Sequence, residues 1–194
     1  MVDWLINVDR NLFLILNGLN NGFFDLIMFW VSDKLIWIPL YLFFLFLFIK
    51  KYKINTLWIL LAVAILITCS DQSSVLIKNL VQRFRPCHDP ILQMQVHTVY
   101  GKCGGKYSFP SSHATNFFAL VFFIIPFLKS YWKFFPAALI LWVSTICYSR
   151  IYLGVHYPGD VLAGSLLGAF LGWIFVKVFL NILPKINQFI NKPD

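Results

Sequence analysis

Long apolar runs separated by short polar stretches make up most of the chain. Five of them are too uniformly apolar for the amphipathic helices that cover a soluble core, and each approaches the roughly 20 residues that cross a bilayer as a helix. They cover Leu35 to Ile49, Thr56 to Ile77, Ala114 to Leu128, Phe134 to Tyr148 and Val161 to Leu183. The pattern therefore predicts five membrane-spanning helices.

The segment before these runs is apolar as well, but it is interrupted. Between Trp4 and Ser32, the turn-forming sequences Asn17-Gly18 and Asn20-Asn21-Gly22 break the pattern. An interfacial helix followed by a partial span fits this segment, and so does a sixth span. The predicted fold is all-α: a polytopic transmembrane helical bundle of five to six spans.

Composition supports a membrane protein with one domain. Of the 194 residues, 59% are hydrophobic and 12% are charged, whereas roughly a quarter of the residues in a soluble domain are charged. One bundle accounts for the whole length, so residues 1–194 are expected to form a single domain. The formal net charge of +8 fits basic loops beside anionic headgroups, and the pattern does not favour nucleic acid as a partner. The expected partner is the lipid bilayer.

Lysines gather in alternate connections between the predicted spans. They are Lys50, Lys51 and Lys53 in one connection, Lys129 and Lys133 in another, and Lys177, Lys185 and Lys192 towards the C-terminus. Because short basic loops stay on the cytoplasmic side, this set is expected to face the cytoplasm. The loops at 83–112 and 150–160 should then face the periplasm or exterior, with the protein in the inner (cytoplasmic) membrane.

The last apolar run carries small residues at a four-residue spacing. Gly164, Gly168 and Gly172 fall on one face of a helix, where they allow another helix to approach closely. This spacing predicts tight packing of the last span against a neighbour.

Three polar clusters lie at ends of apolar runs, and the predicted topology places all three at one membrane face. The first is Lys78-x6-Arg85-Pro86. A helix that begins near Thr56 and rises about 1.5 Å per residue reaches the interface by Lys78, where the two cations can meet. Taken alone, this cluster is also typical of basic side chains that snorkel from the end of a span.

The second cluster is Pro110-Ser111-Ser112-His113, which leads directly into an apolar run. The free amides of a helix N-terminus favour an anion, and small serine side chains let a phosphate approach them. Taken alone, a serine here is a helix cap and His113 is a polar interface residue.

The third cluster is Ser149-Arg150-x5-His156-x3-Asp160. If a helix begins near Pro158, His156 and Asp160 lie on nearly the same side, and the carboxylate can accept a hydrogen bond from the imidazole. An imidazole oriented in this way is suited to act as a nucleophile.

Taken in order, the three clusters resemble the signature of the type-2 phosphatidic acid phosphatase superfamily, over Lys78 to Asp160. One departure is visible, because the second motif of that family usually reads Pro-Ser-Gly-His and Ser112 replaces the glycine here. A serine keeps the backbone N–H, so the phosphate contact is expected to survive.

The resemblance implies a lipid phosphatase and a role for each residue. His156 would attack phosphorus to form a phosphohistidine, Asp160 would orient it, and His113 would protonate the leaving group and then activate water. The expected phosphate-binding residues are Lys78, Arg85, Ser111, Ser112 and Arg150. No metal or other cofactor is expected, because three fixed cations take the place of a metal ion.

A membrane transporter or channel is the alternative function, since the same polar residues could bind an anion on a pathway. A pathway needs polar groups through the midplane, and the clusters lie on one side. Within the enzyme class, undecaprenyl diphosphate, lipid A phosphate and phosphatidylglycerophosphate are the substrates that the resemblance implies. The motif residues would contact the phosphate, so they do not distinguish between these three lipids.

Two of the four cysteines flank the polar loop. Cys87 and Cys103 are expected on the extracytoplasmic side, where an oxidising compartment favours a disulfide between them. His88, Asp89 and His97 lie in the same loop, but their spacing matches no standard zinc pattern.

Overall fold

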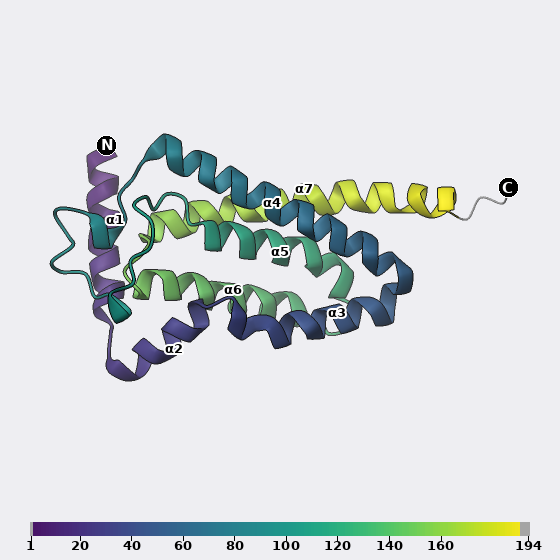
Figure 1. The fold of residues 1–194 in the computed structure, drawn as a ribbon, viewed down its shortest axis with the longest axis horizontal. Coiled ribbons are helices and arrows are strands. Elements are labelled where there is room, and N and C mark those ends of the chain that lie inside the picture. Colours follow the sequence, from purple (N-terminus) through teal and green to yellow (C-terminus); the bar gives the residue numbers. More distant parts are fainter. Residues whose placement is uncertain (1, 191–194) are drawn as a thin grey trace.

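Seven α-helices make up the fold in the computed structural model, which describes residues 2–190 (Figure 1). They are α1 (Val2–Gly18), α2 (Gly22–Ser32), α3 (Ile38–Tyr52), α4 (Thr56–Val81), α5 (Ser112–Leu128), α6 (Phe135–Tyr152) and α7 (Pro158–Ile190). Helices α3 to α7 coincide with the five apolar runs of the sequence. The predicted all-α bundle is confirmed.

Three segments are long and apolar enough to cross a membrane. They are Leu35–Val81, which contains α3 and α4 on either side of a short turn, Phe135–Tyr152 and Pro158–Ile186. Helix α5 is equally apolar but shorter. The long axes of these helices run roughly side by side, so the protein crosses the membrane several times (Figure 1).

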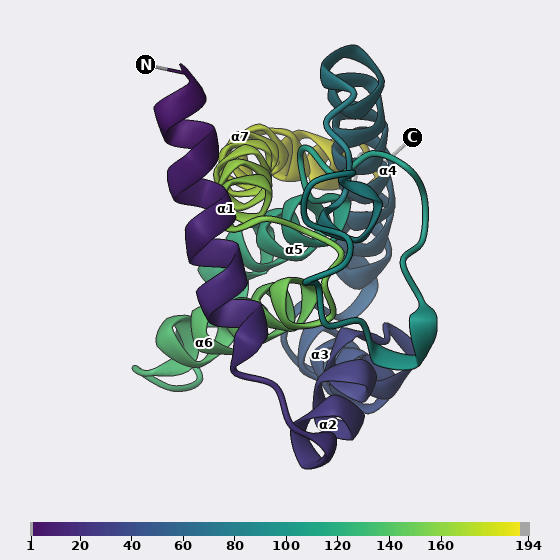
Figure 2. The ribbon, with the colours of Figure 1, turned by 90° about the vertical axis from the view of Figure 1, so that its left-hand side faces the viewer.

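The N-terminal segment is bent. Helices α1 and α2 meet at an angle of 115°, and α1 runs across one end of the bundle instead of along it (Figures 1 and 2). Of the two arrangements that the sequence allowed, the structure has a crosswise helix followed by a short second helix. Asn21 caps α2, its side chain accepting a hydrogen bond from the Phe24 amide.

Helices α5 and α7 pack at very short range because of the glycines in α7. A Cβ atom built on Gly164, Gly168 or Gly172 would lie 2.6, 2.2 or 2.4 Å from a backbone oxygen of α5. Only glycine permits this approach, and the tight packing predicted from the four-residue spacing is confirmed. The two helices that carry opposite sides of the polar site are thereby held in a fixed register.

The bundle core is aromatic. Phe44, Phe123, Phe127 and Phe179 are buried between α3, α5 and α7, and Trp142 of α6 meets Phe44 edge-on. Many of the remaining large apolar side chains are exposed, which suits helices that face lipid.

The two ends of the bundle differ in charge. The turns at 53–55 and 129–134 lie at the end opposite α1 and carry Lys53, Lys129 and Lys133, with Lys50 and Lys51 in the last turn of α3. Lys177 and Lys185 lie in α7, and Lys192 lies outside the described residues. The loop at 82–111 and the α6–α7 connection lie at the other end, where α1 crosses the bundle (Figures 1 and 2). The three polar clusters therefore share one end of the molecule, as their spacing predicts.

Candidate active site

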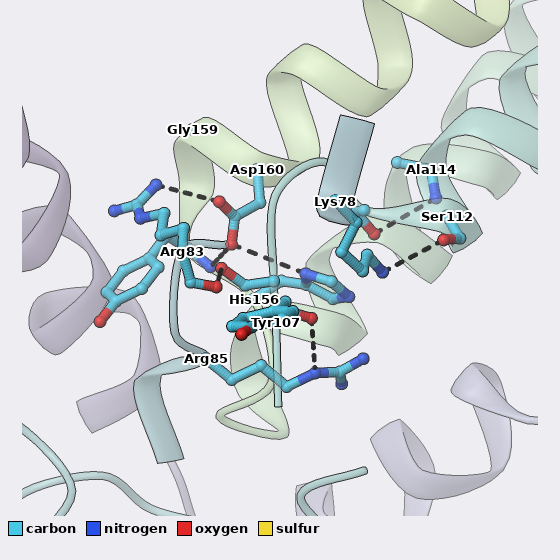
Figure 3. A network of polar contacts seen from close by, with 12 residues as sticks. Lys78, Arg83, Arg85, Tyr107, Ser112, Ala114, His156, Gly159 and Asp160 are labelled. Atoms are coloured by element: carbon cyan, nitrogen blue, oxygen red, sulfur yellow. Dashed lines mark hydrogen bonds and ion pairs between the residues drawn. The ribbon is translucent and has the colours of Figure 1, made fainter. Parts of the chain in front are cut away.

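Six structural elements bring the polar clusters together, and Figure 3 shows Lys78, Arg85, Ser112, His156 and Asp160 among their residues. Lys78 lies in the last turn of α4, and Arg85 follows in the loop. Ser111 caps α5, Arg150 lies in the last turn of α6, and His156 lies between α6 and α7. Asp160 follows in the first turn of α7, and His113 in the first turn of α5.

His156 and Asp160 form a buried pair. Their side chains are 2% and 0% exposed, and His156 Nδ1 lies 3.6 Å from Asp160 Oδ2. This distance is longer than a hydrogen bond, so Nδ1 has no hydrogen-bond partner in the described part of the chain. Such contacts are often long in a free enzyme and tighten when the substrate binds. The other ring nitrogen, Nε2, points away from Asp160 (Figure 3).

The pKa of His156 is held well below its ordinary value of 6.5. The largest cause is burial, and the charges of Arg85, Arg150 and Lys78 act in the same direction. The neutral imidazole is therefore the stable form, and a neutral imidazole has the lone pair that a nucleophile needs.

Arg85 and Arg150 are only partly satisfied within the protein. Arg85 donates to the carbonyl oxygens of Tyr107 and Cys103, at 3.2 and 3.0 Å. Arg150 donates to the hydroxyl of Ser32, and its buried Nε has no partner in the structure. Both line an open cavity of about 290 Å³ at this end of the bundle.

Burial lowers the pKa of Arg85, with the Asp160 carboxylate acting against it. Among residues 2–190, no carboxylate lies within 4.0 Å of Lys78, Arg85 or Arg150 in an ion pair. Three cations gathered without paired carboxylates make a site that favours an anion with several oxygens.

The two serines hold the start of α5. Ser111 is fully buried, and its hydroxyl oxygen accepts a hydrogen bond from the Ala114 amide at 3.4 Å, which leaves its O–H free to donate. The Ser112 hydroxyl accepts from Lys78 Nζ at 3.2 Å and lies 2.8 Å from the Ser74 hydroxyl. The sequence suggested only a backbone role for Ser112, but its side chain positions Lys78.

His113 lies beside the cations, within electrostatic range of Arg150 and His156, and its ring packs against Phe117. It is on the α5 side of the site, whereas Asp160 approaches His156 from α7. Two histidines therefore face the same cluster of cations, His113 from the start of α5 and His156 from the α6–α7 connection.

Arg83 has a different place from the one its sequence suggests. In the sequence, its charge beside the phosphate-binding residues fits either an anionic headgroup or ordinary membrane-surface charge. In the structure Arg83 pairs with Asp160 at 2.9 Å and with Asp9 of α1 at 2.8 Å. Both contacts join residues far apart in the chain, so no local pattern identifies them.

Cys87 and Cys103 form a disulfide with a Cα–Cα distance of 6.0 Å, which closes the loop beside Arg85. His88 lies beside the two sulfur atoms, and the three residues have the geometry of a possible metal site. The disulfide leaves neither thiolate free, so this group does not fit a metal ion.

Comparison with known proteins gives a family and several relatives. Residues 55–183 match the model of the PAP2 superfamily. A protein named lipid A 4'-phosphatase from Bacteroides thetaiotaomicron is 37% identical over 192 residues, 97% of this chain and 84% of that protein. A protein of the same name from Porphyromonas gingivalis is 38% identical over 181 residues, 92% of this chain and 76% of that protein.

Two solved structures share the fold. One is the PAP2-type phosphatidylglycerolphosphate phosphatase of Bacillus subtilis, with a TM-score of 0.65 and 21% identity over 91% of this chain and 86% of that one. The other is LpxE of Aquifex aeolicus, with a TM-score of 0.64 and 25% identity over 87% of this chain and 94% of that one.

Proposed function

The chain belongs to the PAP2 superfamily and is a multi-pass membrane phosphatase that acts on a lipid, and from this premise we propose that it removes the 4'-phosphate of lipid A. Two relatives named lipid A 4'-phosphatase match 97% and 92% of the chain, whereas the family model covers residues 55–183. Undecaprenyl diphosphate and phosphatidylglycerophosphate remain the comparison substrates.

The observation that carries the proposal is the buried His156 among three cations without paired carboxylates. Lys78, Arg85 and Arg150 would hold the nonbridging oxygens of a phosphate, with the Ser111 hydroxyl and the Ser112 amide adding hydrogen bonds. Charge that spreads over these oxygens in the transition state is then met by groups already in place.

In the first step, His156 Nε2 attacks phosphorus, and the bond between phosphorus and the sugar oxygen breaks. His113 donates a proton to the departing oxygen. The positive charge that develops on the His156 ring is stabilised by Asp160, whose Oδ2 lies on the Nδ1 side. The product is a phosphohistidine and a free sugar hydroxyl.

In the second step, His113 takes a proton from a water molecule that attacks the phosphohistidine. Inorganic phosphate leaves and His156 returns to its neutral form. The fixed cations supply the charge that a metal ion supplies in other phosphoryl-transfer enzymes, so we propose that the reaction needs no metal.

An apolar cavity supports a lipid as the substrate. It has a volume of about 310 Å³, lies between α3, α4 and α5, and is lined by side chains such as Phe44, Leu60 and Phe117. Because His113 and Phe117 lie one helical turn apart on α5, an acyl chain in this cavity would place its headgroup near the cations. The charge asymmetry of the chain supports an active site on the periplasmic face of the inner membrane.

The test is a side-by-side assay of purified protein in detergent with bisphosphorylated lipid A, undecaprenyl diphosphate and phosphatidylglycerophosphate. We expect release of inorganic phosphate, with lipid A losing one phosphate group that fragmentation mass spectrometry assigns to the 4' position. Added chelator should leave the rate unchanged.

The matched variant is His156→Gln, which keeps the size and polarity of the side chain and removes the nucleophile. We expect it to lose all measurable hydrolysis while keeping the wild-type unfolding temperature. Hydrolysis at the wild-type rate by His156→Gln would refute the mechanism, and preference for another lipid would refute the substrate. A transporter would leave every lipid intact.

A further inference from the structure

Arg83 lies between two carboxylates from opposite ends of the chain. Its Nη1 contacts Asp160 Oδ1 at 2.9 Å, and its Nη2 contacts Asp9 Oδ2 at 2.8 Å. The guanidinium also lies 3.9 Å from the centre of the Tyr157 ring. Both terminal nitrogens are therefore occupied, and Figure 3 shows Arg83 on the other side of Asp160 from His156.

Asp160 depends on these contacts because it is completely buried. One oxygen accepts from Arg83, and the other accepts from the Tyr157 amide at 2.8 Å while facing His156 Nδ1. A carboxylate without solvent keeps its charge and direction only through such partners. The ion pair with Arg83 therefore favours the charged form of Asp160 and fixes the direction in which one of its oxygens points.

Asp9 fixes Arg83 and the start of α7 together. Its Oδ1 accepts a hydrogen bond from the Gly159 amide at 2.7 Å, and its Oδ2 pairs with Arg83. A Cβ atom on Gly159 would lie 2.8 Å from the same carboxylate, so α1 is in close contact with the first turn of α7. Helix α1 thereby supplies Asp9, the residue farthest from the site in a chain of contacts that runs through Arg83 and Asp160 to His156.

A second set of contacts holds α1 in this place. Arg10 donates to Asp89 Oδ2 at 2.8 Å, and the Tyr157 hydroxyl donates to the same oxygen at 2.8 Å. Burial raises the pKa of Asp89, but hydrogen bonds from the Ile91 amide, Tyr157 and Arg10 outweigh this effect and hold the pKa below its usual value. The carboxylate therefore stays ionised. Consecutive residues of α1, Asp9 and Arg10, are thus both anchored beside the His156 loop.

We propose that Asp9 and Arg83 are positioning residues for the phosphatase reaction, holding Asp160 ionised and aimed at His156. The inference rests on the proposed role of His156 as nucleophile. It extends the functional machinery to α1, which lies outside the residues that match the family model. Neither residue touches the phosphate.

The test uses Asp9→Asn, a change of one atom. The amide oxygen can still accept the Gly159 hydrogen bond, whereas the amide nitrogen cannot pair with Arg83. In metal enzymes, removing the outer partner of a ligand commonly costs about 10–100-fold in activity, and we expect an effect of similar size for the outer partners of Asp160. We expect kcat on the lipid substrate to fall about 10-fold or more, with an unchanged Ki for inorganic phosphate as a competitive inhibitor, because the three cations remain.

Arg83→Lys and Arg83→Gln form a graded pair. Lysine keeps the charge but can reach only one carboxylate well, so its kcat should lie between that of wild type and that of Arg83→Gln. Asp25→Asn is the matched control. This variant removes a carboxylate on α2 that has similar exposure, pairs with His97 and makes no contact with Asp160 or Arg83. It should keep the wild-type kcat.

The result that would overturn the inference is a wild-type kcat in both Asp9→Asn and Arg83→Gln. A fall in kcat that comes with a matching rise in the phosphate Ki, or with the same fall in Asp25→Asn, would overturn it as well. Failure of the proposed function looks different, because wild type would then release no phosphate or His156→Gln would remain active.

Discussion

Substitution of Gly168 by alanine tests whether the glycine face of α7 sets the geometry of the active site. Two physical effects predict opposite changes in the stability of the protein. Alanine has the higher helix propensity, by about 1 kcal/mol, and would stabilise the protein if space were open. In the structure, however, the new Cβ would lie 2.2 Å from the Thr115 carbonyl oxygen and 2.9 Å from its carbon.

The magnitude follows from these contacts. Ordinary contact begins near 3.4 Å, so α5 and α7 must move apart by about 1 Å at this level. Because the atom in the way belongs to the backbone, no rotamer change relieves the clash, and overpacking of this kind costs about 1–3 kcal/mol. After the gain in propensity, we expect a net loss of up to about 2 kcal/mol and a fall of up to about 8 °C in the apparent unfolding temperature.

Activity should fall together with stability. Helix α5 carries Ser111 and α7 carries Asp160, and the Ser111 amide donates to the Asp160 carbonyl at 3.0 Å. If the helices move apart at Gly168, the hydrogen bond between Ser111 and Asp160, about two helical turns along α7, should lengthen. Thermal unfolding in detergent and kcat on the lipid substrate measure the two effects. Gly22→Ala, at a helical glycine with no atom within 4 Å, is the control.

A Gly168→Ala protein with an equal or higher unfolding temperature would refute the reasoning, because propensity alone would then explain the result. An unchanged kcat despite a lower unfolding temperature would show that α5 and α7 do not transmit the displacement to the site.

Three further predictions concern the loop and the phosphate site. Replacing Cys87 and Cys103 by serine should lower stability by about 3 kcal/mol, given their sequence separation of 16; an unchanged thermal unfolding curve would contradict this. Because burial holds its pKa well below 6.5, His156 should stay neutral from pH 7.5 to 5 in ¹⁵N NMR of the phosphate-free protein. The unfolded chain binds this proton more readily, so the free energy of unfolding should decrease as the pH falls below the pKa of a free histidine. A titration midpoint near 6.5 for His156 would refute the assignment. Ser112→Gly, which restores the usual family motif, should raise the phosphate Ki about 2–10-fold because Lys78 loses its hydroxyl acceptor. A Ki equal to wild type would show that the hydroxyl does not hold Lys78.

Much of the fold can be predicted from the sequence because hydropathy is a local property. Each of the five apolar runs became one helix, and the glycine spacing in α7 identified a face that another helix approaches. The crosswise direction of α1 could not be predicted. Its apolar pattern suits a helix along the membrane as well as one through it, and tertiary contacts of Asp9 and Arg10 decide between them.

The proposed site also has features that the sequence predicts and features that it does not. The motifs place His156 one helical turn from Asp160, and the structure has the two side chains in contact. The partners of Arg83 could not be predicted, because its charge alone suits an anionic headgroup and two carboxylates equally well. Only the folded chain brings Asp160 and Asp9 to it. The side-chain contact of Ser112 with Lys78 was also missed, since spacing carries no information on which hydroxyl faces an ammonium group.

The contact between α1 and α7 also has a consequence for biosynthesis. Asp9 leaves the ribosome early, but the Gly159 amide that it binds is synthesised 150 residues later. During insertion, therefore, no chain that ends before Asp160 contains the full set of contacts around the active site, whatever helices have already entered the membrane. Assembly of the first helix against the last is a late, non-local step. A chain truncated before α7 would carry the phosphate-binding cations without an aligned nucleophile, so catalytic competence would arise only after the start of α7 has been synthesised.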